Sequence, residues 1–333
     1  MKTSTGGNYQ LILLAPGGGE QTDITSLVGT LSWSGADRQT ARELAGTLAI
    51  PRDGSVAIPP LQEGAQLAFL LGGEQLFTGP LVTVTTTSQS AMVDFGALDN
   101  GRHLAGNDGW YSFSNVAPEA ACAAIARDFD IPVDTLVKTG AAVSRMFPGV
   151  ALDRIMTSLY ALAAEKTGKR YHLRFTGAGR LTVTERPTAA SMEVRTTMSV
   201  TNTWDVSALS NSVAIYSDDG ALIRRIDDAD SIALNGRLEH VITQRSGTDA
   251  AAEAKAWLAD HGLQQRLTVE ICPGDVRMLT GGGVLLRDTG SGVSGLFWIE
   301  GDTHTWKNGL YRTQLKLNFR QLTDDSIAGS AVS

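Results

Sequence analysis

The sequence predicts a mainly β fold with a small α+β insert, and three observations support this. Only 19% of the 333 residues are charged and 36 are Gly, a composition typical of strands joined by many turns. Short apolar or alternating runs fill both ends of the chain, whereas two helical patterns occur between them. Near the C-terminus, Asn308-Gly309 separates two β-rich runs. This pair predicts a hairpin, because a type I′ turn needs positive φ at both central residues.

Changes in pattern along the chain predict four segments. Residues 1–100 read as a first β domain of short strands separated by turn residues. Residues 101–198 read as an α+β middle domain with two helices and a hairpin. Residues 199–322 read as a second β domain with one embedded helix, and residues 323–333 as a polar tail. With 42% hydrophobic residues, the chain can build more than one core.

Three helices are predicted, the first two from apolar residues at three- and four-residue spacing and the third from its Ala and Glu content and its caps. The first begins near Pro118, because Pro suits the first helical turn. The second covers ALDRIMTSLYALAAEKTG and ends at Gly168, which tolerates a left-handed C-terminal conformation. The third covers DAAAEAKAWLADHG, with Thr248 or Asp249 as its cap and Gly262 at its end.

The Asn308-Gly309 turn fixes a register for the last hairpin. The pairs predicted on its apolar face are Trp306–Tyr311, His304–Thr313, Asp302–Leu315, Glu300–Leu317 and Trp298–Phe319. The pairs predicted on the opposite, wet face are Thr305–Arg312, Thr303–Gln314, Gly301–Lys316 and Ile299–Asn318. We expect the first face to pack inward and the second to contact water.

Glu300, Asp302 and His304 alternate along this hairpin and suggest two interpretations. A metal site or an acid/base cluster would use all three on one face. Alternatively, they are structural, since a bulge at Gly301-Asp302 would reverse the facing of Glu300 and strand ends also hold carboxylates paired to Arg or Lys. We adopt the structural interpretation, because alternating ligands on one strand are a weak motif without a matching third segment.

The remaining motifs indicate no catalytic, cofactor-binding or metal-binding site. GSGVSG at 290–295 has the spacing of a dinucleotide fingerprint but leads into a strand, where that fingerprint must open a helix. Cys122 and Cys272 lie far apart, with no Cys or His nearby in a zinc-like spacing, and are expected to be small buried residues. We therefore predict no catalytic residue, no metal site and no cofactor.

The run VTVTTTS at 82–88 has an unusual uncharged face. Thr83, Thr85 and Thr87 share that face, whereas solvent-exposed edge strands usually carry Lys or Glu that prevent pairing with other chains. The strand can lie in the middle of a single-chain sheet or in a sheet that continues across subunits. We predict the second arrangement, with the three Thr side chains facing a lumen or a neighbouring chain.

Charge and hydropathy limit the partners. A net charge of −7 disfavours an extended nucleic-acid-binding surface, because phosphate binding depends on Lys and Arg. The apolar run near the N-terminus is too short for a signal peptide, and no segment approaches the ~20 apolar residues of a membrane span. We expect a protein that folds in a cytoplasm and does not insert into a membrane.

Long stretches of sequence carry a family resemblance. They include YQLILLAPGGGEQTDITSLVGTLSWSGADRQTARELAGTLAIP, IARDFDIPVDTLVKTG, SNSVAIYSDDGALIRRIDDADSIALNGRLEHVITQ and GLFWIEGDTHTWKNGLYRTQLKLNFR. Over about residues 8–322 the chain resembles the tail-hub proteins of PBSX-type prophages. Such proteins are similar to the baseplate hub of contractile phages and to the hub part of type VI secretion spikes.

The resemblance implies an architecture and partners. Two related tube-type β-barrel domains would flank the α+β domain, and a homotrimer would form a pseudo-sixfold ring that matches the hexameric tail tube. The ring would bind the tail tube protein, the tape-measure protein, the central spike protein and other baseplate proteins, and DNA would pass through it without specific binding. The protein would reside in the virion tail or baseplate after synthesis in the bacterial host cytoplasm.

On this interpretation the wet face of the last hairpin lines the lumen. Its side chains are Thr303, Thr305, Arg312, Gln314 and Lys316. Small hydroxyl and amide groups suit a lumen for DNA, whereas the two cations require partner carboxylates. The alternatives are a tail-associated cell-wall hydrolase and a soluble carbohydrate- or protein-binding module. A hydrolase needs a carboxylate pair or a Cys/His set in a cleft, and a module should be monomeric or dimeric.

Overall fold

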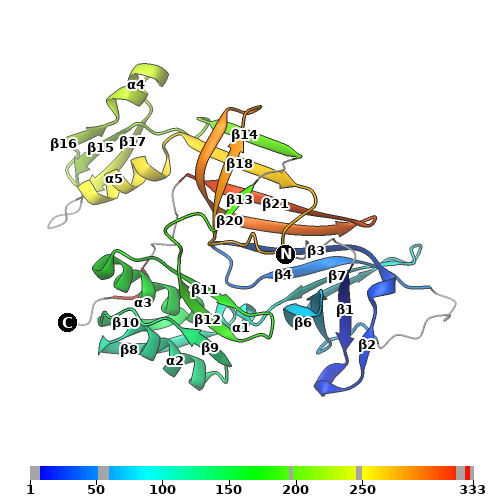
Figure 1. Cartoon of the computed structure of the whole chain (residues 1–333). Helices are drawn as coiled ribbons and strands as arrows, with labels where there is room; N and C mark the ends of the chain where they lie inside the picture. Colours follow the sequence, from blue (N-terminus) through cyan, green and yellow to red (C-terminus); the bar gives the residue numbers. More distant parts are fainter. Residues whose placement is uncertain (1–7, 52–59, 195–197, 245–249, 320–326, 331–333) are drawn as a thin grey trace. The chain divides into compact units, whose positions relative to one another are not determined.

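A computed structural model of the chain describes residues 8–51, 60–194, 198–244, 250–319 and 327–330 (Figure 1). The predicted mainly β fold with an α+β insert is confirmed. By contacts, the chain divides into two compact units, one made of residues 1–200 and 268–333 and the other of residues 201–267. The four-segment division of the sequence stays a prediction, and most of its polar tail lies outside the described residues.

Seven strands form the N-terminal part of the larger unit. They are β1 (Tyr9–Leu14), β2 (Gln21–Asp23), β3 (Val28–Ala36), β4 (Glu43–Ala49), β5 (Gln66–Leu71), β6 (Glu74–Thr86) and β7 (Met92–Leu98). Two short 3-10 helices, Pro16–Gly18 and Thr25–Leu27, lie among the first three strands. β6 changes partner along its length, since 74–80 pair with β5 and 81–86 pair with β7.

Four strands from the other end of the sequence extend the same sheet. They are β18 (Gln264–Ile271), β19 (Gly283–Asp288), β20 (Val293–Lys307) and β21 (Leu310–Asn318), and β18 spans the boundary between the units. The strand order is β18-β21-β20-β3-β4-β7-β6-β5-β1-β2, with β19 on β20 and the short parallel β13 (Met192–Val194) on β19. Figure 1 shows the orange and red β20 and β21 alongside the blue β3 and β4. The antiparallel β3–β20 pair therefore joins strands from opposite ends of the chain.

The sheet encloses an apolar core on one side. Leu31, Trp33 and Leu44 from one end of the chain pack with Trp306 and Tyr311 from the other, and all five are buried. The rings of Trp306 and Tyr311 stack with centroids 4.5 Å apart, as expected for the directly paired positions predicted in the hairpin. The predicted inward-facing aromatic face is thus confirmed at Trp306 and Tyr311, next to the turn.

The last hairpin confirms the predicted turn and corrects part of the predicted register. Asn308 and Gly309 have φ of 52° and 72°, as a type I′ turn requires. Every predicted pair from the turn to Gly301–Lys316 is present. Beyond it a bulge leaves Glu300 unpaired, so the observed pairs are Ile299–Leu317 and Trp298–Asn318. The predicted pairs Glu300–Leu317, Trp298–Phe319 and Ile299–Asn318 were wrong, because an extra residue in one strand reverses the facing beyond it.

The middle part packs helices on small sheets. Its helices are α1 (Gly101–Ala105), α2 (Pro118–Asp128) and α3 (Leu152–Thr167), and its strands are β8 (Asp108–Val116), β9 (Val133–Leu136), β10 (Val143–Ala151), β11 (Tyr171–Phe175) and β12 (Leu181–Glu185). As predicted, α2 starts at Pro118 and α3 ends at Gly168, whose φ is 69°. The apolar stripes of α2 and α3 meet in one buried core, which contains Ile125, Ile155 and Leu159.

The smaller unit contains a three-stranded sheet with strand order β16-β15-β17. Its elements are β15 (Ser212–Ser217), β16 (Leu222–Asp227), α4 (Ala229–Asn235), β17 (Glu239–Gln244) and α5 (Ala251–Asp260), while β14 (Ser199–Asp205) spans the boundary between the units. Val213, Ile215 and Ile242 form its core with α5. The predicted α5 caps, Thr248 and Asp249, lie outside the described residues. None of the described helices is long and apolar enough to span a membrane.

Gly46 in β4 tests how tightly the strands pack. A Cβ on this residue would meet the carbonyl oxygen of Thr30 and would lie 3.2 Å from the ring of Phe95. We expect Gly46→Ala to lower the free energy of unfolding by about 1–3 kcal/mol, since overpacking a close strand contact forces a backbone shift. Thermal or urea denaturation of the full chain measures this change.

Gly290→Ala is the matched control, because its Cβ would lie 3.6 Å from Asp288 Oδ2, an ordinary contact. Equal stability of the two variants would show that the sheet accommodates the added methyl group at Gly46.

Candidate assembly surface

The polar face of the last hairpin continues across the sheet, as the strand register shows. Directly paired residues point to the same side of a sheet, so paired rows can be followed from β21 to β6. The three rows are Arg312–Thr305–Ser32–Ala45–Gly96–Thr83, Leu310–Lys307–Thr30–Thr47–Asp94–Thr85 and Gln314–Thr303–Ser34–Glu43–Leu98. We call these residues, together with Lys316 opposite Gly301, the hydroxyl face. It unites Thr83 and Thr85 with the hairpin residues that the sequence singled out separately.

Side-chain contacts agree with this placement. Thr30 Oγ1 and Thr47 Oγ1 lie 2.8 Å apart, in hydrogen-bond contact across β3 and β4. A Cβ on Gly96 would lie 2.6 Å from Thr83 Oγ1, so the Thr83 side chain covers this glycine. Thr30, Ser32 and Ser34 were not predicted for this face, although they alternate with the buried Leu31 and Trp33 in the run TLSWS.

Five charged side chains lie on the hydroxyl face, three cations and two carboxylates, and they partly compensate one another. Arg312 Nη1 lies 3.1 Å from Glu270 Oε1, so this cation is paired within the chain. Lys316 is exposed and has no ion-pair partner in the part of the chain that the structure describes. Lys307 is a further exposed cation, and Glu43 and Asp94 add two carboxylates of opposite sign. The face is therefore rich in small hydroxyl groups and close to neutral.

The hydroxyl face ends at an open strand edge. Residues 81–86 of β6 pair with β7, and no other described strand pairs with them. Val82 and Val84 are 39% and 38% exposed on this edge. Thr87 lies beyond the end of β6, so its placement on the same face stays a prediction.

A buried charge network holds β20 to the N-terminal strands. Asp302 accepts a bidentate interaction from Arg42, whose guanidinium also lies 4.1 Å from the Trp33 ring centroid. The backbone N–H and the hydroxyl of Thr280 donate to Asp302 Oδ1 at 2.7 and 2.6 Å. His304 Nε2 lies 3.2 Å from Asp302 Oδ2, and its Nδ1 lies 2.8 Å from Tyr311 Oη. The network satisfies a carboxylate that would otherwise be costly to bury.

Glu300 stands apart from this network. The bulge removes it from the face of Asp302 and His304, and its Oε1 accepts a hydrogen bond from Asn318 Nδ2 at 2.7 Å. Among the described residues, no group of three His, Cys, Asp or Glu side chains is placed to hold a metal ion. The geometry favours the structural interpretation of Glu300, Asp302 and His304.

Comparison with known proteins assigns the family. A family model described as YQBQ-like matches residues 31–318. The chain belongs to the YQBQ-like family. This YQBQ-like chain is 24% identical over 305 residues to the phage-like element PBSX protein XkdQ of Bacillus subtilis, with 86% of this chain and 91% of the relative covered. The predicted resemblance to PBSX-type proteins is confirmed.

Solved structures share the fold of this YQBQ-like chain. The 43 kDa tail protein of prophage MuSo2 from Shewanella oneidensis matches with a TM-score of 0.65 and 12% identity, over 93% of this chain and 98% of that one. The E. coli c3393 protein, a type VI secretion component similar to T4 phage tail proteins gp27 and gp5, matches with a TM-score of 0.50 and 10% identity, over 92% and 76%. The fold is therefore one found in phage tail and type VI secretion proteins.

The Asp302 network makes a prediction for stability. Asp302→Asn leaves the guanidinium of Arg42 without its counter-charge, so we expect the free energy of unfolding to fall by about 3 kcal/mol. The control is Asp275→Asn, whose partner Arg277 is 68% exposed and should cost less than about 1 kcal/mol. Denaturant unfolding of both variants compares them, and equal losses would contradict a special role for the buried pair.

The same carboxylate predicts a pH dependence. Burial alone would raise the pKa of Asp302, but the charge and hydrogen bonds of Arg42, together with the nearby His304, outweigh it and hold the pKa below its ordinary value. The stabilisation is thus fully present above the unfolded pKa of about 3.9 and is lost as the pH falls below it. Below about pH 4, wild-type stability should fall more steeply than that of Asp302→Asn. Parallel pH profiles in acid would refute this assignment.

Proposed function

We propose that this chain is the structural hub of a phage tail or phage-tail-like particle. Three copies would form a pseudo-sixfold ring that joins the hexameric tail tube to the central spike and the baseplate. The observation that carries the proposal is the hydroxyl face, a surface that spans six strands, from β21 to β6, and that carries eight Thr and Ser side chains on β20, β3, β4 and β6. Family membership and the shared tail-protein fold support the same role.

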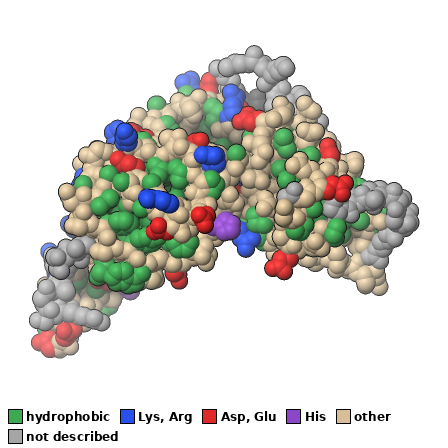
Figure 2. Space-filling view, turned by 90° about the horizontal axis from the view of Figure 1, so that it is seen from below, with side chains coloured by type: hydrophobic (Ala, Val, Ile, Leu, Met, Phe, Trp, Pro, Cys, Tyr) green, Lys and Arg blue, Asp and Glu red, His purple; other side chains and the backbone are tan. Residues whose placement is uncertain are grey.

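In this ring the hydroxyl face lines the lumen or a subunit seam. A lumen through which DNA or tape-measure protein passes must contact its cargo without binding it tightly. Hydroxyl groups suit this requirement, because they hydrogen-bond to water and carry no net charge. The Arg312–Glu270 pair supports this by removing one cation that would bind phosphate. Lys and Arg side chains also lie among Asp and Glu on the face drawn in Figure 2, where the described residues form no basic stripe.

The open edge of β6 is the proposed site of subunit contact. An edge strand with unpaired N–H and C=O groups is a template for pairing with another chain. Residues 81–86 carry valines and threonines and no charged side chain that would block such pairing. The sheet would then continue from one subunit to the next. We also expect the two β parts of each subunit to be structurally related, since three copies must present six similar surfaces.

We further propose that the chain has no enzymatic activity. Burial raises the pKa of the Cys122 thiol, which is fully buried and therefore unsuited to nucleophilic attack. The carboxylate Asp302 and the imidazole of His304 are also inaccessible within the core. These features disfavour the cell-wall hydrolase, and a binding module is distinguished from a hub by its subunit number.

The ring predicts a trimer. Light scattering after size-exclusion chromatography should give about three times the subunit mass of 35.3 kDa, for the chain alone or with its spike protein. A monomer or dimer under both conditions would refute the hub and favour the binding module.

Thr85→Lys tests the subunit edge. An added charge at a buried seam costs a few kcal/mol, so we expect association to weaken at least about tenfold while the isolated chain still folds. Thr243→Lys, on an exposed strand of the smaller unit, is the matched control and should leave the trimer intact. Circular dichroism checks folding and sedimentation checks association. Unchanged association of Thr85→Lys would place this strand outside the seam.

A further inference from the structure

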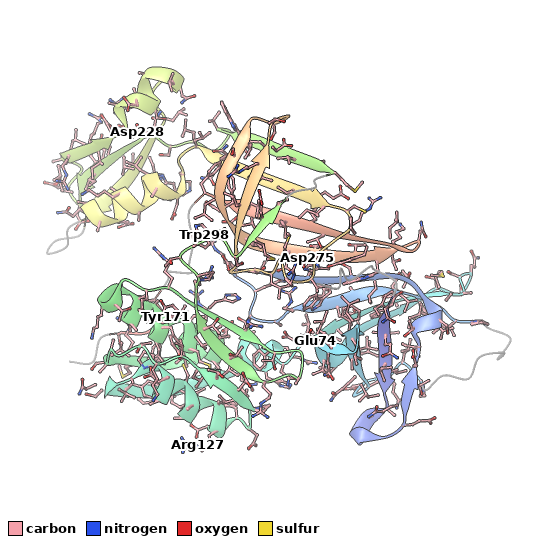
Figure 3. The ribbon with its side chains drawn as sticks, viewed as in Figure 1. Glu74, Arg127, Tyr171, Asp228, Asp275 and Trp298 are labelled. Carbon is pink, nitrogen blue, oxygen red and sulfur yellow. The ribbon has the colours of Figure 1, made fainter. Side chains whose placement is uncertain are left out.

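A cleft of about 410 Å³ lies between the N-terminal strands and the middle part, within the larger unit. It is bordered by the β3–β4 connection, the start of β6, β11, the end of β12 and the β18–β19 connection. Figure 3 labels Glu74 at the start of β6 and Tyr171 in β11, in the two parts that border the cleft. The proposed hub function does not use this cleft.

Alternation along β11 directs basic side chains toward the cleft. Tyr171 and Phe175 belong to the buried core under α3, whereas His172 and Arg174 line the cleft. Arg186, just beyond β12, joins them and is held by Asp37 through contacts of 2.8 and 3.2 Å. One side of the cleft thus presents two guanidinium groups and an imidazole.

His172 is a neutral hydrogen-bond donor in this setting. Burial, followed by the charges of Arg186 and Arg174, lowers the pKa of His172 to about 3. Its Nδ1 lies 3.5 Å from Arg186 Nη2, so Nδ1 acts as the acceptor and the ring proton is on Nε2. No partner for Nε2 occurs among residues whose placement is described.

Several other donors around the cleft lack acceptors. Arg174 is half-buried and makes neither a hydrogen bond nor an ion pair with any described residue. Nε of Arg42 and Nε1 of Trp33 are buried without a hydrogen-bond partner, and both residues line the cleft. Buried polar groups are nearly always satisfied, so this concentration of unpaired N–H groups needs an explanation.

The pairing of charges in the cleft also indicates that an anion could bind there. Asp302 balances Arg42 and Asp37 balances Arg186, but no carboxylate pairs with Arg174 in the described part of the chain. Burial and the nearby charge of Arg42 lower the pKa of Arg174, and the attraction of Asp134 offsets this only in part. At the rim, Glu185 is already paired with Lys169 at 2.8 Å. Glu74, also at the rim, is exposed and has no ion-pair partner among the described residues, so the unpaired positive charge of the cleft interior is that of Arg174.

We propose that this cleft binds a small tetrahedral oxyanion of the phosphate class. Arg174 would bind it through its guanidinium fork, and Arg42 Nε and His172 Nε2 would donate further hydrogen bonds. The donors come from both sides of the cleft, which suits a tetrahedral anion better than a planar carboxylate. The bound anion would connect the β3–β4 connection to β11 and stabilise the arrangement of the N-terminal strands and the middle part.

Inorganic phosphate is the probe for this site. We expect calorimetric titration of the full chain to show saturable binding at one site per chain, and the thermal midpoint to rise in phosphate relative to chloride at equal ionic strength. Arg174→Gln should weaken the affinity at least about tenfold, since charge-assisted hydrogen bonds are lost. Arg127→Gln on α2 removes the same charge from an exposed position outside the cleft and should bind like wild type.

Either of two results with phosphate would overturn the proposal, and so would one result with acetate. One is the absence of saturable phosphate binding by wild-type protein, which requires no variant to fold. The other is wild-type affinity in Arg174→Gln, which would locate the anion elsewhere. Acetate binding as tightly as phosphate would reject the tetrahedral class. Because binding is measured on each chain, failure here is distinguishable from failure to form a trimer.

Discussion

The Arg42–Asp302 ion pair and the β3–β20 strand pairing beside it are the interactions on which this structure depends most. The two residues are 260 positions apart in the sequence, yet their charged groups meet in the core. Arg42 also covers Trp33, and Asp302 also fixes Thr280 and His304. Each element that contacts this pair is thereby positioned relative to the others, and the sheet becomes continuous from β21 to β6.

Continuity alone does not produce the hydroxyl face, because the side-chain facing must also match across each strand pair. The bulge in the β6–β7 pair achieves this, whereas the bulges in the β3–β4 and β20–β21 pairs lie just beyond the paired rows and limit the face there. Each inserts one residue and so reverses which side chains point outward beyond it. Val82, the extra residue in β6, places Thr83 opposite Gly96 and on the same side as Ser32. Without it, the threonines of β6 would face the core side.

Local sequence patterns determined what could be predicted. The Asn308-Gly309 turn, the start of α2 at Pro118 and the end of α3 at Gly168 each follow from short-range chemistry, and the structure confirms them. The register failed beyond Gly301, since a bulge depends on what packs against both strands. The pairing of β3 with β20 has no local signal, so the hydroxyl face appeared in the sequence as two unrelated polar runs. Likewise, the alternation of His172 and Arg174 was visible, but the surface opposite them was not.

The β3–β20 pair also has a consequence for the order of folding. A ribosome adds about 5–20 residues per second, so roughly 15–50 s pass between the synthesis of β3 and that of its partner segment in β20. During this interval one edge of β3 has no native partner and can pair with strands of other chains. Contacts between residues so distant in sequence also form slowly, because a long loop must close first. The edge of β3 that β20 covers in the native sheet is therefore open to mispairing until the last hairpin emerges.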